Sequence, residues 1–185
     1  MGAVLVLQLS KQIGTRRPQR TGLGVAMALH DDLLEQAHHL ATRERTKPRQ
    51  ASLRRAVSTA YYAIFHLLIT ETVCKWKIGA QRSQLARIFE HARMNSASER
   101  VLKQGTQSSG ESPNVVAHLK RVATAFRRLY DNRQSADYDT STQWSRTDVV
   151  ELVDLAQGAF ASMKAIRHEP IVHDYLLSLF VRERR

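Results

Sequence analysis

Apolar residues recur along most of this chain at intervals of three and four, the spacing that places side chains on one face of an α-helix. Eight glycines and four prolines in 185 residues are few, and most of them fall outside the periodic segments. A fold of strands and turns would need more of both residues. The pattern therefore predicts an all-α protein, an up-and-down bundle of four to five main helices.

The ends of the expected helices follow from caps and breakers. The Lys47-Pro48 pair separates the first two helices, because a residue before proline disfavours the helical conformation. The Ser112-Pro113 pair opens a later helix with proline at its first position. We therefore expect helices at about 30–45, 49–74, 83–94 and 114–133, a long one from Ser145 with Asp148 in a capping-box variant, and a short one from Pro170.

Two stretches lack this regular pattern. Residues 95–112 are rich in Ser, Gln and Gly and are predicted to be a loop that contains one helical turn at 99–103. Residues 1–26 combine a short apolar run with a basic run, and a regular helical segment begins at Met27. We therefore expect residues 1–26 to be a disordered or loosely packed extension, with Met27 as the natural start. Residues 27–185 are expected to form one helical domain.

The chain carries a net charge of +11 at pH 7. An excess of this size favours partners that carry phosphates, either nucleic acid or nucleotide, although part of the excess lies at the two chain ends. The single cysteine, Cys74, excludes an internal disulfide, is expected as buried filler at a helix end, and fits a reducing cytoplasm. No apolar run reaches the roughly eighteen residues of a membrane span, and no persuasive signal peptide is present.

The helix expected at 49–74 has an unusual second face. At about 100° per residue its apolar positions share one side, and four other residues line up opposite them: Arg55, Thr59, Tyr62 and His66. A solvated stripe usually carries Lys and Glu, whereas this one carries a guanidinium, a hydroxyl, a phenol and an imidazole, which bind ligands or move protons. Tyr62 and His66 could equally be core-edge residues whose polar tips are satisfied within the protein.

Two sequence motifs point to one family. The first has the form R-x-A-x-S-x-A-Y-Y-A-x-F-H and runs from Arg54 to His66, and the second, R-x-x-A-D-Y-D, runs from Arg133 to Asp139. Together, in this order, they resemble HEPN-domain proteins, and the resemblance covers roughly residues 27–163. These are small all-α proteins, mostly of prokaryotes, many of which work beside nucleotidyltransferases or cleave RNA as toxins. The resemblance therefore implies an HEPN-like helical bundle.

The resemblance also implies a cytoplasmic homodimer that binds or cleaves RNA, as one half of a toxin–antitoxin or defence pair with a nucleotidyltransferase-type partner. In RNA-cleaving members, an Arg and a His a few residues later form the site, and each protomer contributes one copy. The Arg holds the phosphate, and the imidazole transfers the 2′-hydroxyl proton. Here Tyr138 stands where that His would follow Arg133, and a phenol with a pKa of about 10 is a poor base at neutral pH. Arg167 and His173 also satisfy the spacing, but they span Pro170 and lie beyond the expected segment.

Arg133 lies in line with the apolar face of its helix if that helix continues far enough. A fixed cation there must be paired or must line a cleft; alternatively, the helix ends a turn earlier and Arg133 is solvated. Asp137 and Asp139 are close enough in sequence to pair with it, and Tyr138 can pack in the core or offer its hydroxyl to a ligand. The candidate catalytic residues are Arg133, His66 and Tyr138, and the candidate ligand or RNA contacts are Arg55, Tyr62, Arg127, Arg128 and Asp137.

Arg127 and Arg128 share the outer side of their helix with Lys120 and Arg121, which makes this side either a solvated face or an RNA footprint. No zinc-ligand spacing and no phosphate-binding glycine loop occur, so neither a metal nor another cofactor is expected. Two functions remain open. The protein is either an HEPN-type RNA-binding protein or metal-independent ribonuclease, or a non-catalytic dimeric HEPN module that binds a nucleotide or a partner protein.

Overall fold

The computed structural model describes residues 22–104 and 110–181, which contain helices and no strand. The long helices are α1 (Gly22–Thr42), α2 (Gln50–Cys74), α5 (Pro113–Tyr138) and α6 (Arg146–Ile166). The shorter helices are α4 (His91–Gln104) and α7 (Pro170–Ser178), and a turn of 3-10 helix, η1 (Gly79–Gln81), with α3 (Arg82–Leu85) joins α2 to α4. The all-α prediction is confirmed.

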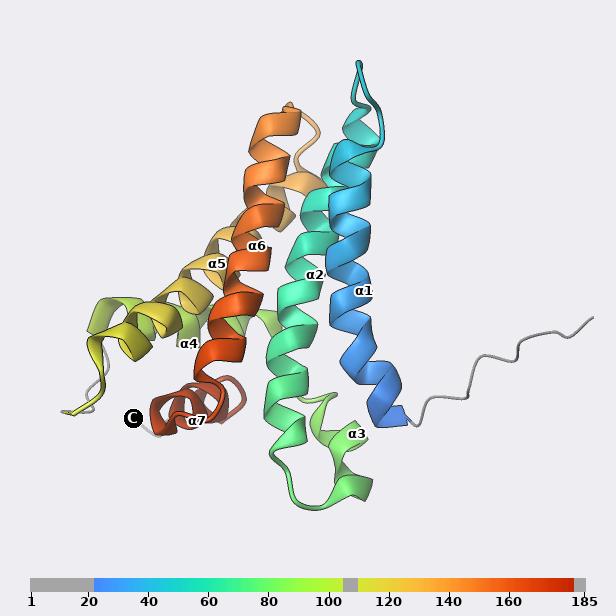
Figure 1. Ribbon diagram of the computed structural model, residues 1–185. Coiled ribbons are helices and arrows are strands. Elements are labelled where there is room, and N and C mark those ends of the chain that lie inside the picture. Colours follow the sequence, from blue (N-terminus) through green and yellow to red (C-terminus); the bar gives the residue numbers. More distant parts are fainter. Residues whose placement is uncertain (1–21, 105–109, 182–185) are drawn as a thin grey trace, which may run out of the picture.

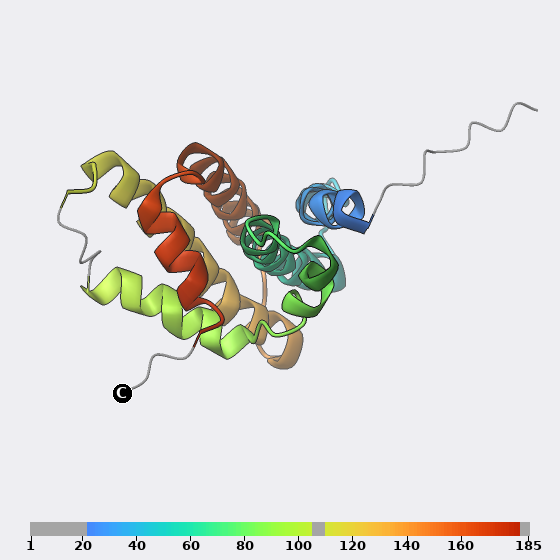
Figure 2. The ribbon, with the colours of Figure 1, turned by 90° about the horizontal axis from the view of Figure 1, so that it is seen from below.

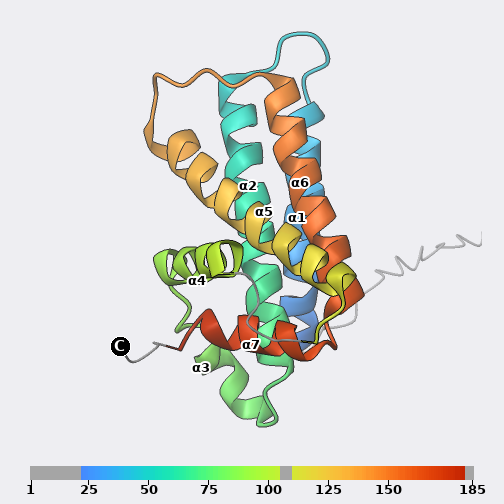
Figure 3. The same cartoon turned by 90° about the vertical axis from the view of Figure 1, so that its left-hand side faces the viewer.

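The four long helices run alternately up and down, with α5 crossing the others obliquely (Figures 1 and 3). The helix α2 lies at their centre, where it packs against α1, α5 and α6. The shorter α4 and α7 lie side by side across the lower part of the bundle, which is clear in the view from below (Figure 2). Every long helix therefore buries at least one face against α2.

Among the described helices, α2 alone is long and apolar enough to cross a membrane. Within that apolar window, 72% of the residues are buried inside the bundle. The predicted apolar stripe of this helix is fully buried, namely Leu53, Val57, Ala60, Ile64 and Leu68. Burial of each large aliphatic side chain stabilises the fold by about 1.5 to 3 kcal/mol. The central place of α2 in the bundle therefore accounts for its composition.

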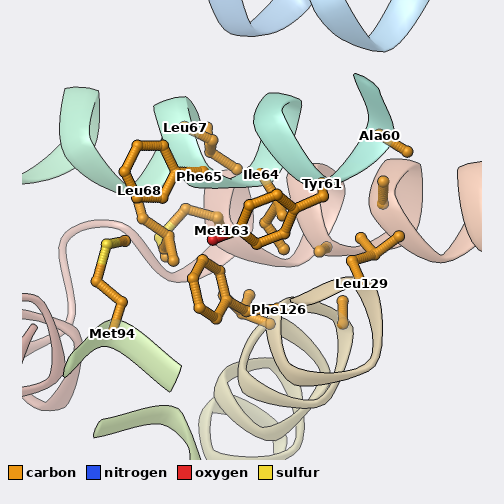
Figure 4. Packing of buried hydrophobic residues seen from close by; sticks show 14 of the residues in the cluster. Ala60, Tyr61, Ile64, Phe65, Leu67, Leu68, Met94, Phe126, Leu129 and Met163 are labelled. Carbon is orange, nitrogen blue, oxygen red and sulfur yellow. The ribbon is translucent and has the colours of Figure 1, made fainter. Parts of the chain in front are cut away.

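Aromatic side chains of α2 and α5 meet in the middle of the core. Tyr61 and Phe126 are fully buried, and their ring centroids lie 5.6 Å apart. Leu129 and Met163 are also fully buried, and the close-up shows them around these rings (Figure 4). Because Tyr61 carries a hydroxyl, its burial requires a hydrogen-bond partner, and the partner lies on α4.

The helix predicted at 83–94 is wrong, and so is the loop predicted at 95–112 over residues 95–104; residues 105–109 lie outside the described residues, and residues 110–112 are not helical. The chain forms only the short α3 there, and the longer helix α4 runs from His91 to Gln104. This helix has few apolar residues, but it buries Met94, Ala97 and Ser98. The Ser98 hydroxyl bonds to the Met94 carbonyl at 2.9 Å and to the Tyr175 hydroxyl at 2.9 Å. Tertiary contacts therefore stabilise a polar segment as a helix, and serine content alone misidentified it as a loop.

Other helix boundaries differ from the predicted ones by several residues. The helix α1 begins at Gly22 rather than near residue 30, and α5 continues to Tyr138 rather than ending near Arg133. Most of the predicted extension, residues 1–21, lies outside the described residues. The starts of α6 and α7 are confirmed: Ser145 caps α6 by accepting a hydrogen bond from the Asp148 amide, and Pro170 opens α7.

Hydrogen bonds tie three connecting segments together at the upper end of the bundle in Figure 1. The Gln50 side chain donates to the Trp144 carbonyl at 2.8 Å and accepts from the Trp144 amide at 2.9 Å. The Arg146 guanidinium donates to the carbonyls of Arg45 and Glu44, the former at 2.9 Å. The start of α2, the α1–α2 loop, the α5–α6 loop and the start of α6 are thereby held together.

Candidate functional site

The two sequence motifs meet in space, because the last turn of α5 packs against the first half of α2. Arg133 lies on α5 with its side chain 18% exposed. Its Nη2 donates to the Tyr62 hydroxyl at 3.0 Å, and its Nε lies 2.8 Å from Oδ2 of Asp137. The Nε hydrogen is not directed at the carboxylate, so the second contact is an ion pair rather than a well-aligned hydrogen bond.

Arg133 is also bracketed by two phenol rings. Its guanidinium carbon lies 5.7 Å from the ring centroid of Tyr62 and 5.5 Å from that of Tyr138, both within the range of cation–π attraction. Tyr138 is the last residue of α5 and is 73% exposed, so its hydroxyl is open to solvent. Asp137 accepts a short hydrogen bond from Ser58 on α2. We call Arg133, Tyr62, Asp137, Tyr138 and Ser58 the Arg133 cluster.

The end of α5 is held in place by Arg54, the first residue of the first motif. Its Nη1 donates to the Ala136 carbonyl at 2.9 Å, and its Nη2 donates to the Thr142 carbonyl at 2.7 Å. The last carbonyls of a helix have no partner within the helix, and a positive charge also complements its dipole. Arg54 therefore explains why α5 continues through the second motif and keeps Arg133 within the helix.

The helix α4 brings an imidazole to this region that sequence reasoning missed. His91 begins α4, and its Nδ1 lies 2.6 Å from the Tyr61 hydroxyl. The ring lies on Phe65, with centroids 4.3 Å apart, and meets Tyr62 edge to face at 6.1 Å. Burial lowers the pKa of His91, and the Arg133 charge lowers it further. His91 therefore stays neutral beside the Arg133 cluster.

His66 occupies a different part of the α2 surface. It is half-buried, and its ring meets Phe65 edge to face at 5.4 Å. Burial lowers its pKa, as do the neighbouring imidazoles of His30 and His91. Within the part of the chain that the structure describes, no hydrogen bond or ring contact joins His66 to Arg133. The structure thus brings Arg133, Tyr62, Asp137 and Tyr138 together but does not bring His66 into contact with Arg133.

Exposed cations surround the upper end of the bundle. They come from the α1–α2 loop and the start of α2, and we call them the basic end: Arg43, Arg45, Lys47, Arg49 and Arg55. Among the described residues, none of these five side chains makes a hydrogen bond or an ion pair. Arg54 bonds to the end of α5, and Gln50 bonds to Trp144 in the α5–α6 loop, so the basic end lies next to the end of α5 that carries the Arg133 cluster.

The other candidate cations are partnered or lie elsewhere. Arg127 pairs with Glu99 at 3.4 Å, whereas Arg128 is exposed on the outer side of α5. Arg167 donates to Glu71 at 2.6 Å, and His173 accepts from the Lys75 ammonium at 2.9 Å. The alternative Arg167–His173 pair is therefore engaged in contacts that hold α2, α6 and α7 together.

The last acid of the second motif belongs to a turn. Asp139 accepts hydrogen bonds from the Ser141 hydroxyl at 2.6 Å, the Thr142 hydroxyl at 2.5 Å and the Ser141 amide at 2.9 Å. The hydroxyl of Ser141, then that of Thr142, lower the pKa of Asp139 to about 2. Asp139 is thus a structural residue of the turn that follows α5 rather than a partner of Arg133.

We expect Asp139 to titrate well below the ordinary Asp pKa of about 3.9. Because the folded pKa is lowered, its stabilising contribution is present above about pH 4 and disappears as the pH falls towards about 2. An NMR titration of the side-chain carboxyl carbons measures this value directly. The Ser141→Ala variant should raise the pKa of Asp139, and titration of the wild-type carboxyl near pH 4 would contradict the bonding.

Comparisons of this chain with protein-family models, with curated proteins and with solved structures find no match. Among the described residues, no group of three or more His, Cys, Asp and Glu side chains is placed to hold a metal ion. The side chains at the site offer several chemically useful groups. These are a partly exposed guanidinium, two phenols, one carboxylate and a neutral imidazole, set beside unpaired cations.

Proposed function

We propose that this protein binds RNA as an HEPN-type module, with the Arg133 cluster and the basic end as one contact surface for the phosphate backbone. One observation carries the proposal. A guanidinium is fixed by Tyr62 and Asp137, and its remaining N–H groups have no partner among the described residues. A guanidinium offers five N–H donors, so these free groups suit a phosphate, and the basic end adds five exposed positive charges near it, two of which lie close to the Glu44 carboxylate.

Two features favour binding over cleavage. Tyr138, a phenol rather than an imidazole, stands where a catalytic base would be needed, and its side chain is exposed to solvent. An exposed ring stacked on Arg133 offers a platform for an RNA base, as aromatic side chains do in single-strand binding proteins. Metal-independent ribonuclease activity stays a prediction, and a cleavage assay on labelled RNA oligonucleotides would decide it. The cytoplasmic location also stays a prediction.

We expect the protein to bind a labelled single-stranded RNA of about ten nucleotides with strong salt dependence. The Arg49→Ala/Arg55→Ala double variant should weaken binding by about tenfold. It should also reduce the slope of log affinity against log salt by about 1.4, because each lost contact to a single-strand phosphate removes about 0.7. Fluorescence anisotropy at several salt concentrations measures both quantities.

The matched control is the Lys120→Ala/Arg121→Ala double variant. It removes the same two charges from exposed positions in the first half of α5, beside a surface groove between α5 and α6. We expect its affinity and salt slope to stay close to wild type. Equal losses in the two double variants would mean that RNA responds only to net charge, and the proposed surface would be wrong.

A second candidate function, a dimeric module that binds a partner protein, is favoured by the opposite end of the bundle. The segments around the end of α2, α3 and α7 carry exposed large apolar side chains: Trp76, Ile78, Ile88, Leu177 and Val181. Exposed apolar patches often mark protein contacts. Light scattering on the wild type and on Leu177→Asp tests whether the protein is a dimer. A monomeric mass for the wild type at all concentrations would contradict the homodimer.

A further inference from the structure

We infer that His91 is a second anion-binding residue of this site, held by Tyr61 as the neutral imidazole with its proton on Nε2, and that it donates this N–H to an RNA phosphate. Neither motif includes His91, because it lies on α4. The inference rests on the proposed function for its ligand, but the protonation state follows from the fold alone. In this assignment Tyr61 is a positioning residue, since it acts on the ligand only through His91.

The protonation state follows from the Tyr61 hydroxyl. Tyr61 is fully buried, and its only hydrogen-bond partner in the described chain is Nδ1 of His91, at 2.6 Å. If Nδ1 carried a proton, the Tyr61 hydroxyl would have to accept, and its own hydrogen would be buried without an acceptor. Such an unsatisfied donor is strongly disfavoured in a protein interior. Tyr61 therefore donates and Nδ1 accepts, which leaves the His91 proton on Nε2.

The surroundings of His91 also oppose a positive charge on the ring. The ring lies against Phe65 from α2, and the Arg133 guanidinium lies nearby on α5. The other titratable groups around it are Tyr62 and His66 on α2, and the Glu90–Arg93 ion pair of 3.2 Å at the start of its own helix. Burial first, and then Arg133, lower the pKa of His91, which agrees with the assignment from the hydrogen bond.

Among the described residues, the free side of His91 has no hydrogen-bond partner. Its Nε2 makes no hydrogen bond with any described residue, and it is not among the buried polar atoms that lack a partner, so it remains accessible to solvent. His91 and Arg133 both contact Tyr62. The ring centroids of His91 and Tyr62 lie 6.1 Å apart, and the guanidinium carbon of Arg133 lies 5.7 Å from the Tyr62 ring centroid. A phosphodiester has two anionic oxygens and can accept from both donors.

This arrangement assigns His91 a definite chemical role. A neutral imidazole with its proton on Nε2 donates a hydrogen bond but cannot accept a proton at that atom. His91 therefore contributes to anion binding rather than to deprotonation of the RNA 2′-hydroxyl. Its affinity contribution should also be independent of pH across the range in which an ordinary histidine titrates, about pH 5.5 to about pH 8.

The protonation state is tested on the full chain without any ligand. Nitrogen-15 NMR of the histidine side chains should show His91 with an acceptor-type Nδ1 and a protonated Nε2 throughout that pH range. The Tyr61→Phe variant keeps the buried ring but removes the donor, so His91 should then exchange between tautomers and gain a proton at low pH. A protonated Nδ1 in the wild type would overturn the assignment.

The ligand role is tested with the same labelled RNA oligonucleotide. His91→Ala should weaken binding by about tenfold, the effect of one hydrogen bond to a charged group. His91→Gln retains an N–H donor and should recover most of this loss. Tyr61→Phe should make binding tighter as the pH falls, and the Tyr61→Phe/His91→Gln double variant should lose that pH dependence. Denaturant melts of each variant establish that the protein is folded.

The outcomes separate the two proposals. If the wild type binds RNA and His91→Ala binds equally well, the role of His91 is overturned while the proposed function stands. If the wild type binds no RNA although NMR finds the predicted protonation state, the proposed function fails, and the ligand role of His91 fails with it. Tight binding by the wild type, a loss with Ala and recovery with Gln support both.

Discussion

Arg133→Ala is expected to lower the affinity for single-stranded RNA by about a hundredfold, because a neutral methyl group replaces a guanidinium that offers paired donors to phosphate. Arg133 also holds Tyr62 and Asp137, so its loss leaves a carboxylate that is only 21% exposed without its cation. We therefore expect the free energy of unfolding to fall by about 2 kcal/mol as well. An RNA titration and a urea melt on the same preparation measure the two effects.

Two further variants separate binding from stability. Arg133→Lys should recover part of the affinity, because an ammonium keeps the charge but lacks the planar fork of donors. Asp137→Asn should lower stability while it leaves RNA affinity unchanged or raises it, since the amide no longer competes with phosphate for Arg133. If both Arg133→Ala and Asp137→Asn lower stability and neither changes binding, Arg133 is a structural residue and the proposed site is wrong.

Arg54→Ala is expected to have the largest effect on stability among the polar substitutions at this site. It removes charge-assisted hydrogen bonds to the carbonyls of Ala136 and Thr142, and these carbonyls lie at the end of α5 and in the turn after it. Because a hydrogen bond to a charged group contributes about 1.5 to 3 kcal/mol, we expect a loss of about 3 kcal/mol in the free energy of unfolding. Urea denaturation gives this value from the midpoint and slope.

The neighbouring Arg55 provides a matched control in the same helix. Its side chain is exposed and unpaired among the described residues, so Arg55→Ala should change stability by less than about 0.5 kcal/mol. Hydrogen exchange adds a local measurement: Arg54→Ala should lose amide protection at residues 135–139, where the helix would fray. Similar stabilities for the two variants would contradict the capping role of Arg54.

The local sequence predicted most of the long helices well. The apolar period of α2, the capping box at Ser145 and the proline at residue 170 each act within one or two helical turns, and all three are confirmed. The same reasoning left open whether Arg133 would be paired, would line a cleft or would be solvated, and the structure pairs it with Asp137 one turn along the same helix. Interactions between residues one or two helical turns apart depend on few residues, so a local sequence pattern can predict them.

The segment from residue 83 to 104 shows where local patterns fail. The apolar spacing predicted a helix at 83–94 and the polar composition predicted a loop from residue 95, yet α4 runs from His91 to Gln104 because Met94 and Ala97 are buried and Ser98 bonds to Tyr175 on α7. The energy of those contacts comes from helices distant in the chain and exceeds the weak local preference. The helix α5 ends later than predicted for a similar reason, because Arg54 on α2 donates hydrogen bonds to carbonyls in its last turn.

The sequence by itself therefore determined the helical class, the stripe on α2 that carries Tyr62, and the candidate role of Arg133. Only the tertiary structure decided which groups from other helices lie near that guanidinium. His91 reaches Tyr61 across 30 positions of sequence, and Arg54 reaches Ala136 across 82. Neither contact leaves a periodic signal, because the relative placement of α2, α4 and α5 results from the packing of the whole core. The way the helices pack thus decides which residues of other helices lie near Arg133.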